Sequence, residues 1–251
     1  LDALGRWSYA WQLPISVNKC SVLHLGRQNT GHTYQLNDTD LPNNKDVVDL
    51  GILVDSNLRF TKHYCVVTNK AHHRASLILR TFKSRDQNLL FKAFTVYVRP
   101  LLEYCSPVWA PVYKTDIAIF ERVQRKFTKR LHGLNLMSYP DRLKALGNVD
   151  SLELRRLKCD LLMIYKIIHG LICIEFDEFF AINNYTRTRG HSLKLVKPVC
   201  NNNCRQFAFA CRCIDAWNGL PSYVINASSV YCFKHELNQI NFNKFLKYNM
   251  H

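Results

Sequence analysis

The sequence predicts an α+β protein that is predominantly α-helical, with a short β-containing segment at its N-terminal end. Apolar residues alternate or form short runs before residue 60, whereas after it they recur at helical spacing. In addition, 47% of the 251 residues are hydrophobic and 12% are aromatic. That content is enough to bury a core and excludes a disordered chain.

The first sixty residues predict short strands joined by polar loops. Short apolar runs in residues 11–25 indicate two strands, or a helix end and a strand. Residues 26–46 are rich in Asn, Asp, Thr and Gly and predict a loop or a weak hairpin. The apolar run 47–54 contains Gly51 and predicts a further β segment, which ends at a turn.

Residues 61–131 predict three helices. The first two cover residues 61–82 and 87–104, and Pro100 should kink or restart the second. The third covers residues 115–131 and has the clearest pattern, because its apolar residues share one face at 100° per residue. The opposite face is expected to collect its basic residues, which are Arg122, Arg125, Lys126, Lys129 and Arg130.

Two more helices are expected in the C-terminal part. Asp150 and Glu153 fit a capping box before a helix that ends at Gly170. Ser228 or Ser229 can cap a last helix running toward Leu246. The residues between them, 183–203, predict a loop or an irregular hairpin.

The charge of the chain is positive and uneven. The 34 Lys and Arg residues outnumber the 19 Asp and Glu residues, which gives a net charge of +15. Residues 59–130 hold fifteen basic and four acidic side chains, whereas residues 1–58 hold four and six. This excess predicts an anionic partner, and the leading candidates are nucleic acid and an anionic membrane surface. The basic block fits a phosphate-binding surface or a solvated helical region.

Several other classes of protein are not expected. No run of 18 apolar residues is present, so we expect no membrane span. The chain opens on Leu1 without a basic and apolar leader, which predicts an intracellular protein of the nucleus or cytoplasm. Ten cysteines without regular spacing indicate reduced thiols. Four of them lack the paired spacing of a zinc knuckle, so we predict no metal site at Cys200, Cys204, Cys211 and Cys213.

Short motifs in a fixed order cover nearly the whole chain. The first set comprises Trp7, Trp11-Gln12-Leu13, Lys19-Cys20, Gly26, Asp49-Leu50-Gly51, Asp55, Leu58, Phe60 and His63. The second comprises Lys70-Ala71, Arg80, Phe82, residues 97–104, Val108-Trp109, residues 121–125, Ser138-Tyr139, Arg142-Leu143, Leu152-Glu153 and Arg155-Arg156. The third comprises Arg189-Gly190-His191, residues 217–221 and Phe233-Lys234.

Together these motifs resemble the region that follows the catalytic Asp-Asp motif in reverse transcriptases of jockey-like non-LTR (LINE-type) retrotransposons. Two positions depart from the family pattern. Ser16 stands where the family usually has Asn, and Ala208-Phe209 stands where it has paired Phe.

The resemblance implies three parts: the tail of a polymerase palm in residues 1–60, a helical thumb-like domain in 61–148 and a C-terminal extension in 149–251. It also implies an RNA-directed DNA polymerase that uses Mg²⁺, held by an Asp-Asp motif and an earlier Asp. Neither occurs in this sequence. The chain is therefore expected to be inactive alone, to hold no cofactor or metal, and to depend on the upstream fingers and palm of the same polyprotein.

The resemblance implies roles for individual residues of the first part. Lys19 matches a lysine assigned as general acid near the leaving pyrophosphate, but outside an intact polymerase it is a solvated lysine. The hairpin with Leu50 and Gly51 resembles the primer grip; the alternative is an ordinary edge hairpin.

The thumb-like part is implied to hold a template-primer duplex by its backbone and shape. We expect RNA, an RNA/DNA hybrid or a DNA duplex as partner. The candidate contacts are Lys70, Arg74, Arg80, Arg99, Arg122, Arg125, Lys126, Lys129 and Arg130. The alternatives are a stand-alone noncatalytic basic binding module and a degenerate remnant of an element.

Other conspicuous residues are assigned to the scaffold or to solvent. Trp109 and Trp217 could stack on bases, but each closes an apolar segment within four residues of a proline, which favours a place in the core. The close carboxylates are expected to be solvated: Asp38, Asp40, Asp177 and Glu178.

Overall fold

The structure, a computed structural model, describes residues 1–26, 28–183 and 190–248, and it is an α-rich α+β fold as predicted. Contacts between Cα atoms divide the chain into two compact units, Leu1–His63 and Tyr64–His251. Residue 149, where a third part was expected to begin, lies inside the second unit. Arg189 of the Arg189-Gly190-His191 motif lies outside the described residues.

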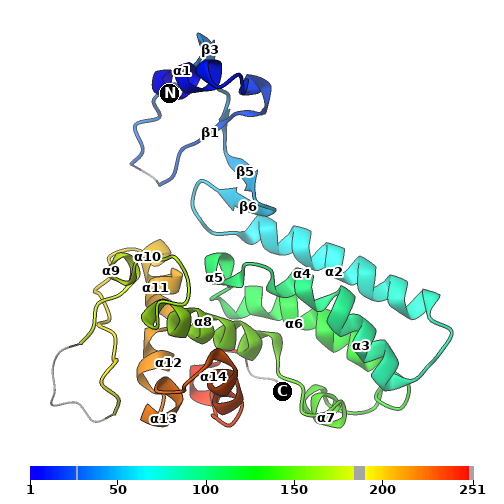
Figure 1. Cartoon of the computed structure of the whole chain (residues 1–251). Coiled ribbons are helices and arrows are strands. Elements are labelled where there is room, and N and C mark those ends of the chain that lie inside the picture. The colour runs from blue at the N-terminus through cyan, green and yellow to red at the C-terminus, as the bar shows by residue number, and fades with distance from the viewer. Residues whose placement is uncertain (27, 184–189, 249–251) are drawn as a thin grey trace. The chain divides into compact units, whose positions relative to one another are not determined.

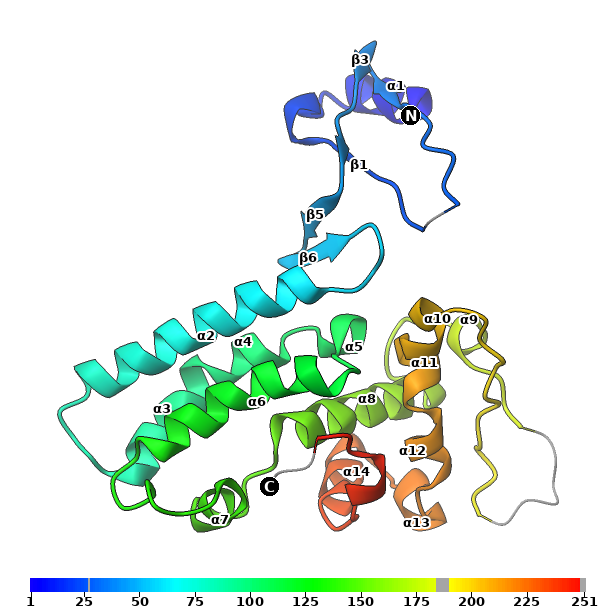
Figure 2. The same ribbon diagram turned by 180° about the vertical axis from the view of Figure 1, so that it is seen from behind.

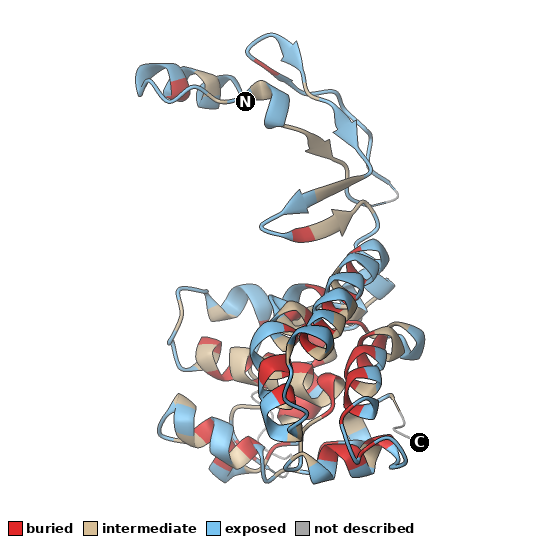
Figure 3. Cartoon of the chain, turned by 90° about the vertical axis from the view of Figure 1, so that its right-hand side faces the viewer, coloured by how far each residue is buried: buried red, intermediate tan, exposed pale blue. Residues whose placement is uncertain are grey.

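The first unit consists of short elements around few buried side chains. Its elements are α1 (Asp2–Ala10), η1 (Val17–Lys19), β1 (Val22–Leu23), β2 (Gln35–Leu36), β3 (Thr39–Asp40), β4 (Asn43–Asn44), β5 (Asp46–Asp49) and β6 (Ile52–Asp55). The sequence pattern did not predict helix α1. Among its described residues, those that are buried are Ser8, Leu36, Ile52 and His63 (Figure 3).

The strands of this unit form three two-stranded sheets. β1 pairs in parallel with β4, whereas β2–β3 and β5–β6 are antiparallel hairpins. The β5–β6 turn consists of Leu50 and Gly51, with φ angles of +45° and +84°. Positive φ at both positions is typical of a type I′ turn, in which glycine is favoured. The expected weak hairpin in 26–46 is present as β2–β3.

The first part of the second unit is a helical bundle (Figures 1 and 2). Its elements are α2 (Thr61–Thr81, whose first turn precedes the unit boundary), α3 (Gln87–Tyr97), α4 (Arg99–Glu103), α5 (Ser106–Trp109), α6 (Lys114–Lys129) and α7 (Tyr139–Ala145). The three predicted helices are confirmed, and the second restarts beside Pro100. The short helices α5 and α7 were not predicted.

The second part is built on one long helix and several short ones. They are α8 (Leu152–Ile168), α9 (Phe176–Phe179), α10 (Asn203–Phe207), α11 (Phe209–Arg212), α12 (Ile214–Asn218), α13 (Ser222–Ile225), α14 (Val230–Leu237) and η2 (Asn243–Phe245). The prediction of a last helix toward Leu246 is wrong in length, because the continuous helix ends at Leu237. A β-bridge pairs Ile182, just before the expected loop, with Leu195, which lies within that loop.

Stacked aromatic rings fill the core of the second unit. The rings of Phe94 and Phe127 lie 4.6 Å apart, and those of Trp109 and Phe120 lie 5.2 Å apart. Trp217 belongs to a cluster of buried residues in the C-terminal half of the unit. Both tryptophans are almost fully buried, which confirms that they are core residues.

A buried ion pair links the two halves of this core. The Arg212 guanidinium on α11 donates to both carboxylate oxygens of Asp160 on α8, at 3.0 and 2.9 Å. It also donates to the carbonyl of Pro107 at 2.8 Å and to that of Phe207 at 3.2 Å. One side chain thus joins α5, α8 and α10.

The N-terminus of α8 corrects the predicted capping box. The N-cap residue is Ser151, whose hydroxyl accepts a hydrogen bond from the Leu154 N–H at 3.2 Å. Asp150 instead pairs with Lys158 through its carboxylate, at 2.7 Å. The Glu153 carboxylate accepts from the N–H groups of Lys247 and Tyr248.

This assignment predicts different effects for two neighbouring substitutions. Ser151→Ala should lower the free energy of unfolding by about 1 kcal/mol, because a donor at the helix start loses its acceptor. Asp150→Asn should cost less, because it removes a partly exposed ion pair and leaves the cap intact. Urea denaturation of the two variants measures the difference; a larger loss for Asp150→Asn would contradict the assignment.

Candidate nucleic-acid interface

Helix α6 separates its apolar residues from a group of exposed cations. Its buried side includes Ile117, Phe120, Val123 and Phe127. Four basic residues are exposed on or directly after the helix, and they form no ion pair with any described residue: Arg122, Lys126, Lys129 and Arg130. We call these four residues the α6 cation surface.

Arg125, the fifth predicted member, lies apart from this surface. Its side chain is half-buried, with the guanidinium carbon 5.0 Å from the centre of the Tyr139 ring and 5.9 Å from that of the Tyr248 ring. These contacts are cation–π interactions within the fold. Arg125 therefore holds α7 and the C-terminal segment against α6.

His72 on α2 lies within electrostatic reach of the α6 cation surface. The pKa of His72 is lowered from its ordinary value of 6.5, first by partial burial and then by the charges of Lys126 and Arg122. The imidazole is therefore neutral at pH 7. This neighbour was missed by sequence reasoning, since a single-helix projection does not show which helices lie side by side.

The C-terminal end of α6 lies beside the turn between α2 and α3. The side-chain amide of Gln87 donates to the His132 carbonyl at 2.6 Å. The turn itself carries Lys83 and Arg85, both exposed. These two cations belong to the basic block of the sequence. The Gln87 contact places their turn near the C-terminal end of α6.

Three predicted residues on α2 lie elsewhere. Lys70, Arg74 and Arg80 are exposed. At 100° per residue, Lys70 and Arg74 lie on the other side of the buried Ala71 from His72, and Arg80 points away from the buried face. Arg74 donates to the carbonyl of Tyr97 on α3, at 3.2 Å. The expected track along α2 is thus separated from the α6 cation surface.

Arg99 is part of an ion-pair network. It lies 3.8 Å from Glu103, whose carboxylate also receives two hydrogen bonds from Arg155. Burial and the charge of Arg155 lower the pKa of Arg99, although it stays protonated at any physiological pH. Paired with Glu103, whose carboxylate also binds Arg155 of α8, Arg99 belongs to the junction of α4 and α8.

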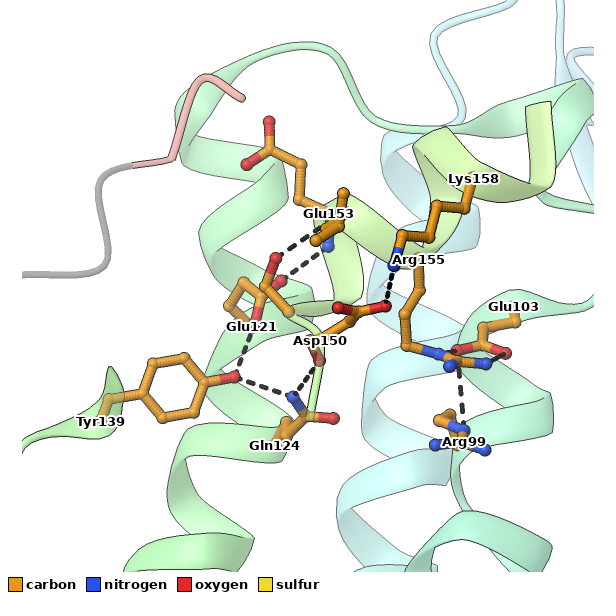
Figure 4. Close-up of polar contacts among 11 residues, drawn as sticks. Arg99, Glu103, Glu121, Gln124, Tyr139, Asp150, Glu153, Arg155 and Lys158 are labelled. Carbon is orange, nitrogen blue, oxygen red and sulfur yellow. Dashed lines mark hydrogen bonds and ion pairs between the residues drawn. The ribbon is translucent and has the colours of Figure 1, made fainter. Parts of the chain in front are cut away.

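The buried side of α6 carries a carboxylate that joins three helices (Figure 4). One oxygen of Glu121 accepts from the Tyr139 hydroxyl of α7, and the other accepts from the Glu153 N–H of α8, both at 2.8 Å. Gln124 donates to the Tyr139 oxygen at 3.1 Å and to the Asp150 carbonyl at 3.2 Å.

Arg156 supplies a positive charge that stabilises the ionised form of the Glu121 carboxylate. It is only 3% exposed, and its guanidinium carbon lies 4.9 Å from the centre of the Phe120 ring. Burial raises the pKa of Glu121, whereas the positive charge of Arg156 and the two hydrogen bonds oppose that shift. A buried carboxylate with these partners is a structural element of the fold.

Many residues of the sequence motifs have such structural partners. The Asn218 side chain pairs with both backbone groups of Leu195, at 2.8 Å each. The Trp217 ring donates to the Leu193 carbonyl at 2.8 Å. In the first unit, the Asp55 carboxylate accepts from the N–H groups of Asn57 and Phe60. These motifs specify tertiary contacts.

The predicted residues of the first unit are exposed. Lys19 ends the 3₁₀ turn η1, and Leu50, at the tip of the β5–β6 hairpin, has 83% of its surface accessible. Within residues 1–26, 28–183 and 190–248, no group of three or more His, Cys, Asp or Glu side chains could hold a metal ion. The Cys200 and Cys211 sulfurs lie 3.7 Å apart, while the Cys213 thiol donates to the Phe209 carbonyl.

The helices of the described segments are too short or too polar to cross a membrane. Fold and surface together define an α-rich α+β protein with a cationic helix face. The chain belongs to the family of the uncharacterized protein B0403.1 of Caenorhabditis elegans, to which it is 34% identical over 143 residues, 55% of this chain and 70% of that protein. No protein-family model matches the chain, and no solved structure matches it.

The Glu121 contacts predict a stability effect. Glu121→Gln keeps the size of the side chain but turns one acceptor into a donor that faces the Tyr139 hydroxyl or the Glu153 N–H. We expect the free energy of unfolding to fall by about 1–3 kcal/mol. Equilibrium urea denaturation, with circular dichroism as the signal, measures the loss. An unchanged midpoint would show that the carboxylate is dispensable for stability.

The position of His72 predicts a shift in its titration. By NMR, its imidazole should titrate below pH 6.5, and Arg122→Gln with Lys126→Gln should move the midpoint up toward 6.5. Because the folded form disfavours the charged imidazole, His72 should contribute stability above pH 6.5 that is lost as the pH falls below it. Lys92→Gln with Lys114→Gln is the control and should leave the midpoint in place.

Proposed function

We propose that this chain binds the sugar-phosphate backbone of a nucleic-acid duplex through the α6 cation surface, with an RNA/DNA hybrid as the preferred form. The observation that carries the proposal is that four neighbouring exposed cations lack carboxylate partners among the described residues. Elsewhere in the second unit, Arg99, Arg155 and Arg212 pair with carboxylates. Unpaired cations on a rigid helix suit contact with phosphates.

The preference for a hybrid, and the place of the chain in a larger protein, come from the resemblance to non-LTR retrotransposon reverse transcriptases. We propose that the chain is the palm tail, thumb and C-terminal extension of such a polymerase. The small number of buried residues in Leu1–His63 supports this proposal, since isolated two-stranded hairpins are marginally stable and need further chain to pack against. Catalysis and Mg²⁺ would then belong to upstream fingers and palm, and no catalytic step is assigned to Lys19.

One observation favours the second candidate, a stand-alone noncatalytic binding module. The aligned segment makes up 70% of the nematode relative, which leaves too little of that protein for the fingers and palm of a polymerase. Nucleic-acid binding by the α6 cation surface is common to both candidates. Inspection of the genomic sequence upstream of this chain for an Asp-Asp motif in an open frame distinguishes them.

Replacement of the α6 cation surface tests the proposal. In the variant Arg122→Gln, Lys126→Gln, Lys129→Gln and Arg130→Gln, hybrid binding should weaken, and the slope of log affinity against log salt should flatten by about 2–4 units. A matched control replaces four exposed lysines that are not part of the α6 cation surface: Lys45, Lys92, Lys114 and Lys144. Fluorescence anisotropy over a salt series measures both affinity and slope.

The control and the position of His72 make the outcome specific. The control variant should lose much less affinity, and bound hybrid should raise the His72 pKa, because phosphates offset the nearby cations. The proposal is wrong if the α6 variant, still folded by circular dichroism, binds with unchanged affinity and slope. Equal losses in both variants would also contradict it, since binding would then depend on overall charge.

A further inference from the structure

A pocket in the second unit lies apart from the α6 cation surface. It has a volume of about 360 Å³ and is lined by residues of α4, α5, α8 and α14 and of the segment before α8. This volume is at the lower end of the range of small-molecule sites. Its described wall contains four cations, Arg155, Arg156, Lys158 and Lys234, against two carboxylates, Glu103 and Asp150.

Both carboxylates of the wall are already engaged. Glu103 receives two hydrogen bonds from Arg155, and Asp150 receives one from Lys158 at 2.7 Å (Figure 4). Two ion pairs therefore account for two of the four cations. Lys234 on α14 is exposed and has no ion pair with the described residues.

The fourth cation is buried with unsatisfied donors. Arg156 is 3% exposed, and neither terminal guanidinium nitrogen has a hydrogen-bond partner among the described residues. Buried guanidinium groups are normally hydrogen-bonded, because an unmade hydrogen bond of a charged group is costly. Arg99 adds a further positive charge beside Glu103. The wall thus has an excess of positive charge and spare donors.

We propose that this pocket binds a phosphoryl anion, presented either by a small phosphorylated molecule or by a nucleic acid. Lys158 and Lys234 reach it from two different helices, α8 and α14. Lys158 also donates to Asn238, at the end of α14, at 2.9 Å. The anion would balance the excess charge of the wall, as paired phosphate and basic side chains do in other sites.

The test uses the full chain with inorganic pyrophosphate as probe. Isothermal titration calorimetry at constant ionic strength should show saturable binding, and pyrophosphate should raise the midpoint of thermal unfolding. Lys234→Gln should weaken binding by about three- to tenfold, and Lys158→Gln should weaken it at least as much. Lys92→Gln is the control, because Lys92 is exposed on α3 and does not line the pocket.

Lys234→Gln keeps the test decisive if Lys158→Gln disturbs the fold through loss of its Asp150 contact. Absence of saturable binding, or an equal loss in Lys92→Gln and Lys234→Gln, would overturn the proposal. The α6 variant should keep its pyrophosphate affinity, so that failure of the proposed function and failure of this site are distinguishable.

Competition with a duplex identifies the source of the phosphoryl group. If the hybrid displaces pyrophosphate and Lys234→Gln also weakens hybrid binding, the anion is a nucleic-acid phosphate and the pocket extends the interface. If saturating hybrid leaves pyrophosphate binding unchanged, the ligand is a small phosphorylated molecule. Either result supports a phosphoryl site in the pocket.

Discussion

The arrangement of helices in the second unit depends on the Glu121 carboxylate. It projects from the buried side of α6, accepts one hydrogen bond from α7 and one from the first turn of α8, and has the charge of Arg156 nearby. A carboxylate without these partners would be strongly disfavoured in the core. The helices must therefore meet in one geometry, in which the α8 N-terminus faces α6.

This constraint determines which basic residues stay exposed. With α7 held by the Tyr139 hydroxyl, the Tyr139 ring covers Arg125 on one flank of α6. The face further round the helix is left to Arg122, Lys126 and Lys129. The chain thus uses its arginines in two ways: some are paired in the interior and organise the fold, and others remain on the surface with their charge available.

Periodic patterns predicted the long helices well and the rest poorly. Residues 61–82, 115–131 and the helix after residue 150 have enough turns for an apolar stripe to be unambiguous. Helices of four or five residues, such as α11 and α12, are stabilised by the core that they contact, and no local pattern specifies them. The capping residue was displaced by one, because Asp150 is recruited by Lys158 from the next turns of α8.

The candidate site was likewise predicted only where it depends on the pattern of a single helix. The helical projection identified the cations of α6, but it could not show that Arg125 is covered or that Arg99 is paired, since both partners come from distant segments. The motifs of the resemblance proved to be mainly contact residues: Glu121, Tyr139, Trp217 and Asn218. In this structure these residues specify tertiary contacts of the fold.

The Arg212–Asp160 pair has a consequence for how this unit can be divided. Arg212 comes from the last quarter of the chain, yet it neutralises a carboxylate in the middle of α8 and holds the backbone of α5. A chain shortened before α11 would leave Asp160 buried and uncompensated. The bundle around α6 and the C-terminal helices are therefore mutually dependent and should unfold in one cooperative transition.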